Sequence, residues 1–142
     1  MSLKFNLTTE PLLSHHADAA LVFVAEQESV TNPLTAISTH SLPKLTQLLA
    51  DLQFKGQRGK VAILPASQGE NFKYVVLAGL GLPDHKLTLE VYRRAVAKVV
   101  RSVAHYNIRT LVSALPSISL FNCSHAELVK QTAISGIMAD YQ

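Results

Sequence analysis

A chain of 142 residues, 48% hydrophobic and 16% charged, is long enough to bury a core without a disulfide or a bound metal. Its net charge of +3 includes no block of like charges, which argues against a dedicated nucleic-acid-binding domain. One cysteine, Cys123, excludes an intrachain disulfide and a cysteine-based zinc site, and it favours a reducing compartment, the cytoplasm.

The sequence pattern indicates neither a membrane segment nor a secretion signal. The longest apolar run, Tyr74 to Leu82, is far shorter than the roughly 20 residues of a membrane span. The N-terminal residues lack the apolar stretch of a signal peptide. We therefore expect a cytoplasmic protein that does not bind membranes.

The first part of the chain predicts two strands and a loop. Leu3, Phe5 and Leu7 alternate with polar residues, as in a half-buried strand. Ala19 to Ala25 is a continuous apolar run, which is typical of a strand buried on both faces. The polar stretch from Glu26 to His40 predicts a loop.

The middle of the chain predicts a helix followed by two short strands. Ser41 is placed to cap the helix, and Gly56 and Gly59 are expected to end it. Val61–Pro65 and Lys73–Gly81 are apolar runs of strand length, the second leading into a glycine turn. The apolar face of the helix comprises Leu45, Leu48, Leu49 and Leu52.

The last part predicts a long helix, a strand and a final helix. Thr88 to Asn107 has one apolar and one charged face. Arg109 to Leu115 reads as a strand that Pro116 stops, and Ser124 to Glu127 forms a capping box for the last helix. The apolar face of the long helix comprises Leu89, Tyr92, Val96, Val99, Val100, Val103 and Tyr106.

These elements predict an α/β fold in the order β-β-α-β-β-α-β-α. Apolar strands joined by amphipathic helices require a sheet covered on both faces. Adjacent strand pairs favour a mixed, mostly parallel sheet flanked by helices on both faces, a three-layer sandwich. We expect residues 1–142 to form one domain, with the chain ending at a domain edge.

A search for catalytic or metal-binding residues yields none. The six histidines, at positions 15, 16, 40, 85, 105 and 125, include no H-E-x-x-H pair. His125 and Glu127 match half of a zinc-deaminase signature, but the cysteine half is missing and Glu127 is expected to cap a helix. Cys123 has no evident catalytic partners, so we predict no catalytic residue and no metal ligand.

Two other features suggest phosphate binding only weakly. The turn from Gly79 to Asp84 follows a strand, but Asp84 stands where a dinucleotide fingerprint needs glycine, and Pro83 lacks an N–H group. Its glycines are better explained by a tight exit from the sheet and close packing of the next helix. The residues Arg93, Arg94, Lys98 and Arg101 form a basic helix face, which is ordinarily a solvated one.

The sequence resembles the N-terminal domain of leucyl aminopeptidases over nearly its whole length. The resembling pattern is G-x-x-G-K-V-x-I-L-P, Y-V-V-L-A-G-L-G, a helix opening T-x-E-x-x-R-x-A, and an L-V-S-A-L strand. It departs from the family at Leu82, where members often have a basic residue. The pattern is carried by Gly56, Gly59–Pro65, Tyr74–Gly81, Thr88–Ala95 and Leu111–Leu115.

The resemblance implies a macro-domain-like fold and a role without chemistry of its own. Members of the family are cytosolic metallo-exopeptidases that release N-terminal residues, leucine among them, from peptides. They are hexamers with two divalent ions, zinc or manganese, in a C-terminal catalytic domain. The family's N-T-D-A-E-G-R metal signature is absent from these 142 residues, so no metal ligand or catalytic residue is carried over.

The chain alone is therefore expected to be non-catalytic and to hold no cofactor. Its expected role is oligomer assembly and control of active-site access, with its own C-terminal catalytic domain and other copies of the full-length protein as partners. The peptide substrate is expected to bind elsewhere. Two alternatives remain, a nucleotide or ADP-ribose binder by analogy with the macro-domain fold, and a DNA-contact module that uses the basic helix face.

Overall fold

The computed structural model describes residues 3–8, 16–26, 42–66, 72–82 and 87–114, together with positions 126, 127 and 130. The predicted boundaries agree closely with these elements, except at the C-terminal ends of the two helices. The predicted loop over residues 26–40 and most of the predicted final helix lie outside the described residues. The elements are β1 (Lys4–Thr8), β2 (Ala17–Ala25), α2 (Leu42–Asp51), β3 (Val61–Pro65), β4 (Phe72–Gly81), α3 (Leu89–Val103) and β5 (Thr110–Ala114).

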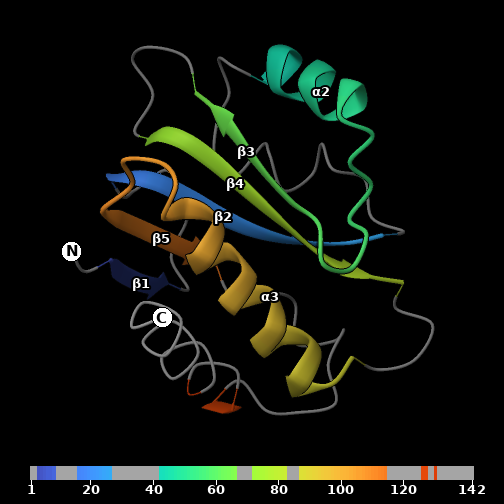
Figure 1. Cartoon of the computed structure of the whole chain (residues 1–142), viewed down its shortest axis with the longest axis vertical. Coiled ribbons are helices and arrows are strands. Elements are labelled where there is room, and N and C mark those ends of the chain that lie inside the picture. The colour runs from blue at the N-terminus through green and yellow to red at the C-terminus, as the bar shows by residue number, and fades with distance from the viewer. Residues whose placement is uncertain are drawn as a thin grey trace.

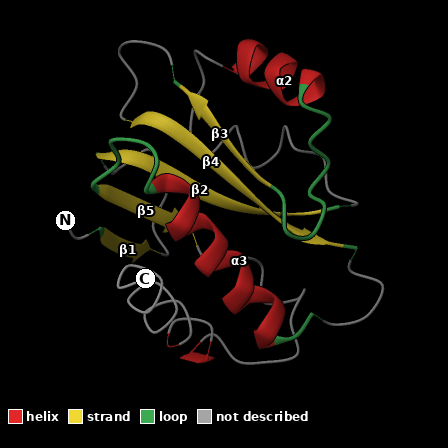
Figure 2. Ribbon diagram, in the orientation of Figure 1, coloured by secondary structure: helices red, strands yellow, loops and turns green. Residues whose placement is uncertain are grey.

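The strands form one mixed sheet in the order β1-β5-β2-β4-β3. Strands β1, β5, β2 and β4 pair in parallel, and β3 pairs antiparallel with β4. Figures 1 and 2 show α2 and α3 on opposite sides of this sheet. The predicted mixed, mostly parallel sheet between two helical layers is confirmed.

Side-chain alternation along the central strands explains why their apolar runs are continuous. In β2, Leu21 packs in the core on the α3 side, and the next residue, Val22, packs in the core on the α2 side. Strand β4 alternates in the same way, with Val76 and Leu77 on opposite sides. Each strand therefore needs apolar residues at consecutive positions, since both faces are covered.

Helix α3 begins at a side-chain cap and buries its predicted apolar face. The hydroxyl of Thr88 accepts a hydrogen bond from the Val91 N–H at 3.3 Å. Tyr92 is fully buried, and its ring lies 5.1 Å from that of Phe23. The prediction that Tyr106 belongs to the apolar face of this helix is wrong, because α3 ends at Val103 and the Tyr106 side chain is 42% exposed.

Helix α2 ends through a Schellman motif and not at the glycines. The Phe54 N–H donates to the Leu49 carbonyl and the Gln53 N–H donates to the Ala50 carbonyl, both at 3.0 Å. Gln53 has φ +57, the left-handed conformation this motif requires. The predicted end at Gly56 and Gly59 is therefore wrong. Leu52 is also 51% exposed, because it follows the last helical turn.

Candidate functional site

The loop from Gly56 to Lys60 lies against the carboxyl end of β4. The Gly79 N–H donates to the Lys60 carbonyl and the Gly81 N–H donates to the Gly56 carbonyl, both at 2.9 Å. The Lys60 ammonium donates to the carbonyls of Leu52 and Gln53 beyond the end of α2, at 3.1 Å and 3.4 Å. The loop is thus fixed both to the sheet and to α2.

Gly79 allows the loop to approach the strand at backbone contact distance. A Cβ atom at Gly79 would lie 2.0 Å from the Gln57 carbonyl oxygen and 2.6 Å from the Gly56 carbonyl carbon. The predicted close packing of the next helix is wrong for this glycine, because the atoms nearest to it belong to the 56–60 loop. Any side chain here would displace backbone, which explains why the strand carries glycine.

Gly81 makes room for the side chain of Arg58. The glycine has φ +86, and a Cβ atom there would lie 3.0 Å from the Arg58 Cβ and 3.3 Å from its Nε. The β2–β4 register shifts between Val24 and Ala25, which pair with Gly79 and Gly81. The Arg58 side chain therefore lies over the irregular end of β4, in space that a Cβ atom at Gly81 would occupy.

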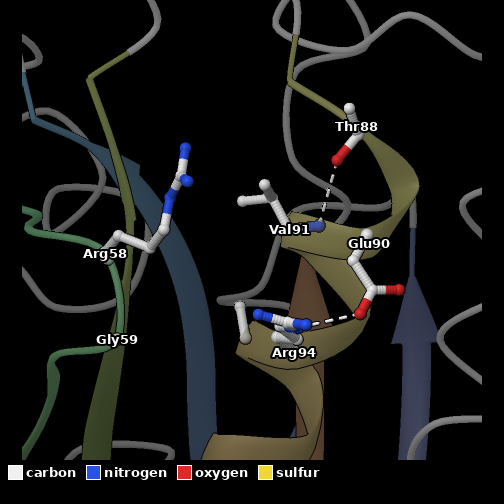
Figure 3. Close-up of a pocket in the computed structure, with 8 residues that line it drawn as sticks. Arg58, Gly59, Thr88, Glu90, Val91 and Arg94 are labelled. Atoms are coloured by element: carbon white, nitrogen blue, oxygen red, sulfur yellow. Dashed lines mark hydrogen bonds and ion pairs between the residues drawn. The ribbon is translucent and has the colours of Figure 1, made fainter.

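A pocket of about 440 Å³ lies between this loop and the first turns of α3. Its loop and strand side consists of Arg58, Gly59 and Gly79. Figure 3 shows Arg58 on that side and the residues of α3 across from it. The pocket lies where β4 ends, and ligands of open α/β sheets bind outside the carboxyl ends of strands. The α3 side consists of Thr88, Glu90, Val91, Arg94 and Ala95.

The charged groups of the pocket are only partly paired with one another. Glu90 accepts a hydrogen bond from the Arg94 Nε at 2.8 Å and also pairs with Arg93. These guanidinium groups hold the pKa of the Glu90 carboxyl below its ordinary value, with the Arg94 hydrogen bond the main cause. Arg58 makes no hydrogen bond or ion pair with the residues that the structure describes.

The predicted basic face of α3 is present, and half of its side chains form ion pairs within the helix. Arg93, Arg94, Lys98 and Arg101 are exposed. Two of them, Arg93 and Arg94, are paired with Glu90. A DNA-contacting surface would therefore have to compete with this carboxylate for half of its cations.

The histidines and the cysteine considered from sequence are not brought together in the described part of the chain. His16 and His105 are exposed, and Glu127 is exposed as well. Cys123 and His125 lie outside the described residues, as do the other three histidines. Within the described ranges, no group of three or more potential metal-binding side chains occurs. The predictions of no catalytic residue and no metal ligand remain predictions.

Sequence reasoning did not identify the pocket. Arg58 and Arg94 are far apart in the chain, and no sequence pattern links one to the other. The Gly79–Asp84 turn and the basic helix face that includes Arg94 were each considered for phosphate binding, but the glycines beside Arg58 were expected only to end a helix. No helix of the described part is long and apolar enough to cross a membrane.

Two solved structures share the fold at low sequence identity. The macrodomain of Mycobacterium tuberculosis DarG matches with a TM-score of 0.74 at 10% identity, over 98% of this chain and 93% of that one. A mutant of tomato leucine aminopeptidase matches with a TM-score of 0.73 at 13% identity, over 99% of this chain and 28% of that one. Identities this low establish the macrodomain-like fold alone.

Sequence comparison identifies the family. A protein of Nostoc punctiforme named "probable cytosol aminopeptidase" is 28% identical over 134 residues, which are 94% of this chain and 26% of that protein. The chain thus spans about a quarter of that relative's length. Residues 21–142 match the model of the cytosol aminopeptidase family, N-terminal domain. This match covers most of the chain, and the chain therefore belongs to the cytosol aminopeptidase family, as a form of its N-terminal domain.

Proposed function

We propose that this chain is the non-catalytic N-terminal domain of a cytosol aminopeptidase, which contributes to oligomer assembly and to active-site access. The observation that carries the proposal is the match of residues 21–142 to this domain of the family. The similar fold of a leucine aminopeptidase supports it, since the likeness covers this chain but only 28% of that enzyme. Peptide hydrolysis then belongs to a C-terminal domain.

The chemistry of the proposed parent is hydrolysis assisted by two divalent ions, zinc or manganese. Paired metals polarise the scissile carbonyl and supply a hydroxide nucleophile. We expect both ions in the catalytic domain, as the family resemblance implies. The proposed setting is a hexamer in the cytoplasm, in which this domain contacts its own catalytic domain or a neighbouring subunit.

An activity assay with matched proteins tests the proposal. The 142-residue chain, the catalytic domain of the Nostoc punctiforme relative, and a fusion of the two are assayed on leucine p-nitroanilide with Mn²⁺. Their masses in solution are measured by light scattering. We expect no turnover by the chain alone, and a larger assembly for the fusion than for the catalytic domain.

Two results would contradict the proposal. Turnover by the 142-residue chain at a rate that its own substitutions alter would show that it is catalytic. A fusion with the same number of subunits per assembly and the same Michaelis constant as the isolated catalytic domain would refute the assembly and access role.

A further inference from the structure

The pocket between the 56–60 loop and α3 places two arginines of distant sequence position against one hollow. Arg58 lines it from the loop and Arg94 from the helix. We propose that this pocket, the Arg58–Arg94 pocket, binds the phosphate group of a small molecule between the two guanidinium groups. No residue of the proposed peptidase chemistry takes part in it.

Arg58 is exposed, and its side chain runs over Gly81. Its Cβ and Nε lie over Gly81, where a Cβ atom would come within 3.0 Å and 3.3 Å of them. The loop on which it stands is fixed to β4 by two backbone hydrogen bonds. The backbone that carries Arg58 is therefore held in place, which limits the freedom that the loop loses when a ligand binds. No residue that the structure describes accepts a hydrogen bond from the Arg58 guanidinium group.

Glu90 orients the guanidinium group of Arg94 but accepts a hydrogen bond from only one of its nitrogens. The hydrogen bond to Glu90 involves the Arg94 Nε, and no contact with a described residue occupies its Nη atoms. The Arg94 side chain is 80% exposed, so the pair adds little to stability but limits the orientation of the guanidinium. An arginine has five N–H donors in a planar fork, which leaves several for a second acceptor.

The charge and shape of the pocket favour phosphate over carboxylate. Two guanidinium groups and one carboxylate give the walls a net positive charge. A planar carboxylate is satisfied by the fork of one arginine, whereas phosphate oxygens point in several directions and can accept from two sides at once. The helix end adds little, because Thr88 already accepts from the Val91 N–H.

The pocket is larger than a phosphate ion. Its volume of about 440 Å³ lies in the range of small-molecule sites, roughly 300–1,000 Å³. Val91 and Ala95 give α3 an apolar wall, and Gly59 and Gly79 leave the opposite wall open to close approach. The remainder of a phosphate ester can lie against these residues, so a small organic phosphate is the class of ligand that fits.

The proposal is independent of the proposed function and can fail separately. It concerns binding by the 142-residue chain alone, whereas the function concerns turnover and assembly with a catalytic domain. A chain that binds phosphate and still assembles with that domain supports both. A substitution in the pocket that abolishes phosphate binding and leaves assembly unchanged would show that phosphate binding and assembly are separate properties.

The test uses NMR of the isotope-labelled chain, titrated with inorganic phosphate and, separately, with acetate at equal ionic strength. We expect saturable shifts of the Gly59 and Val91 amide resonances with phosphate and none with acetate. The R58Q variant should bind phosphate at least about tenfold more weakly, since a hydrogen bond to a charged group contributes that much or more. The R101Q variant, altered on the same helix outside the pocket, should bind within about twofold of wild type.

An E90Q variant distinguishes binding from mere structural disturbance. Removing the carboxylate lessens repulsion of the anion and frees the Arg94 Nε, so phosphate should bind more tightly, by about threefold or more. Far-UV circular dichroism confirms that each variant is folded. The proposal is overturned by unsaturable shifts, by an equal response to acetate, by unchanged affinity in folded R58Q, or by weaker binding in E90Q.

Discussion

Replacing Gly79 by alanine tests whether the 56–60 loop is packed against β4 as closely as the structure indicates. The added Cβ would lie 2.0 Å from the Gln57 carbonyl oxygen, roughly 1.5 Å short of an ordinary contact of about 3.5 Å. The three nearest atoms all belong to the backbone, so no side-chain rotation relieves the clash. The loop or the strand must therefore move.

The expected loss of stability is at least about 3 kcal/mol. Overpacking a close-packed site costs roughly 1–3 kcal/mol. Movement of the loop also weakens the hydrogen bonds from Gly79 to Lys60 and from Gly81 to Gly56, each of which contributes about 1 kcal/mol net. At roughly 4 °C per kcal/mol for a domain of this size, the midpoint of thermal unfolding should fall by about 12 °C.

Urea unfolding followed by far-UV circular dichroism measures the free-energy change. The matched control is Gly59→Ala in the same loop, where a Cβ meets no atom within 4 Å but φ is +80. Its cost should be only about 1 kcal/mol, from the left-handed backbone. A Gly79→Ala variant less than about 1 kcal/mol below wild type, or equal to the control, would refute the close approach.

Three further predictions concern the helix end, the sheet and the acidic group of the pocket. Gln53→Gly should raise the free energy of unfolding by about 0.5–1 kcal/mol, because glycine adopts φ +57 without strain; an unchanged or lower value in urea unfolding contradicts this. Asp18→Ala should lower the free energy of unfolding by about 1–3 kcal/mol, because the carboxylate accepts hydrogen bonds from two backbone N–H groups at the start of β5, at 2.8 Å and 3.2 Å. A loss below about 0.5 kcal/mol in the same assay would count against those bonds. The Glu90 carboxyl should titrate below its ordinary pKa of 4.5, so its contribution to stability is present above that pH and is lost as pH falls through the lower, folded-state pKa. NMR titration should show this pKa rising in R94Q but not in K98Q, and a rise in neither variant would exclude Arg94 as the main cause.

Local pattern was sufficient for most of the secondary structure. The runs at Ala19–Ala25 and Lys73–Gly81 are apolar at every step because both faces of the central strands are covered. The period of α3 was readable because one face packs on the sheet and the other meets water. The predicted ends were wrong at Gly56 and at Tyr106, because a Schellman motif ends α2 at Gln53 and α3 stops at Val103.

The strand order could not be read from these local patterns. Apolar runs require cover on both faces, but they do not say which strand neighbours which. Strand β5 lies between β1 and β2, so two strands that are close in sequence are separated by one from far along the chain. Asp18 stabilises this pairing, because its carboxylate accepts hydrogen bonds from the backbone N–H groups of Arg109 and Thr110. These residues lie 91 and 92 positions further along the chain.

The sequence by itself determined the fold class, the amphipathic helices and, through the order of its motifs, the family. Only the tertiary structure determined where the pocket lies and which residues line it. Antiparallel pairing of β3 with β4 brings Arg58 to the carboxyl end of β4, from which the chain continues to α3. The tight contact at Gly79 likewise depends on two backbone segments meeting in space. Periodicity along one segment records which faces are buried, but it carries no information on which distant residues those faces meet.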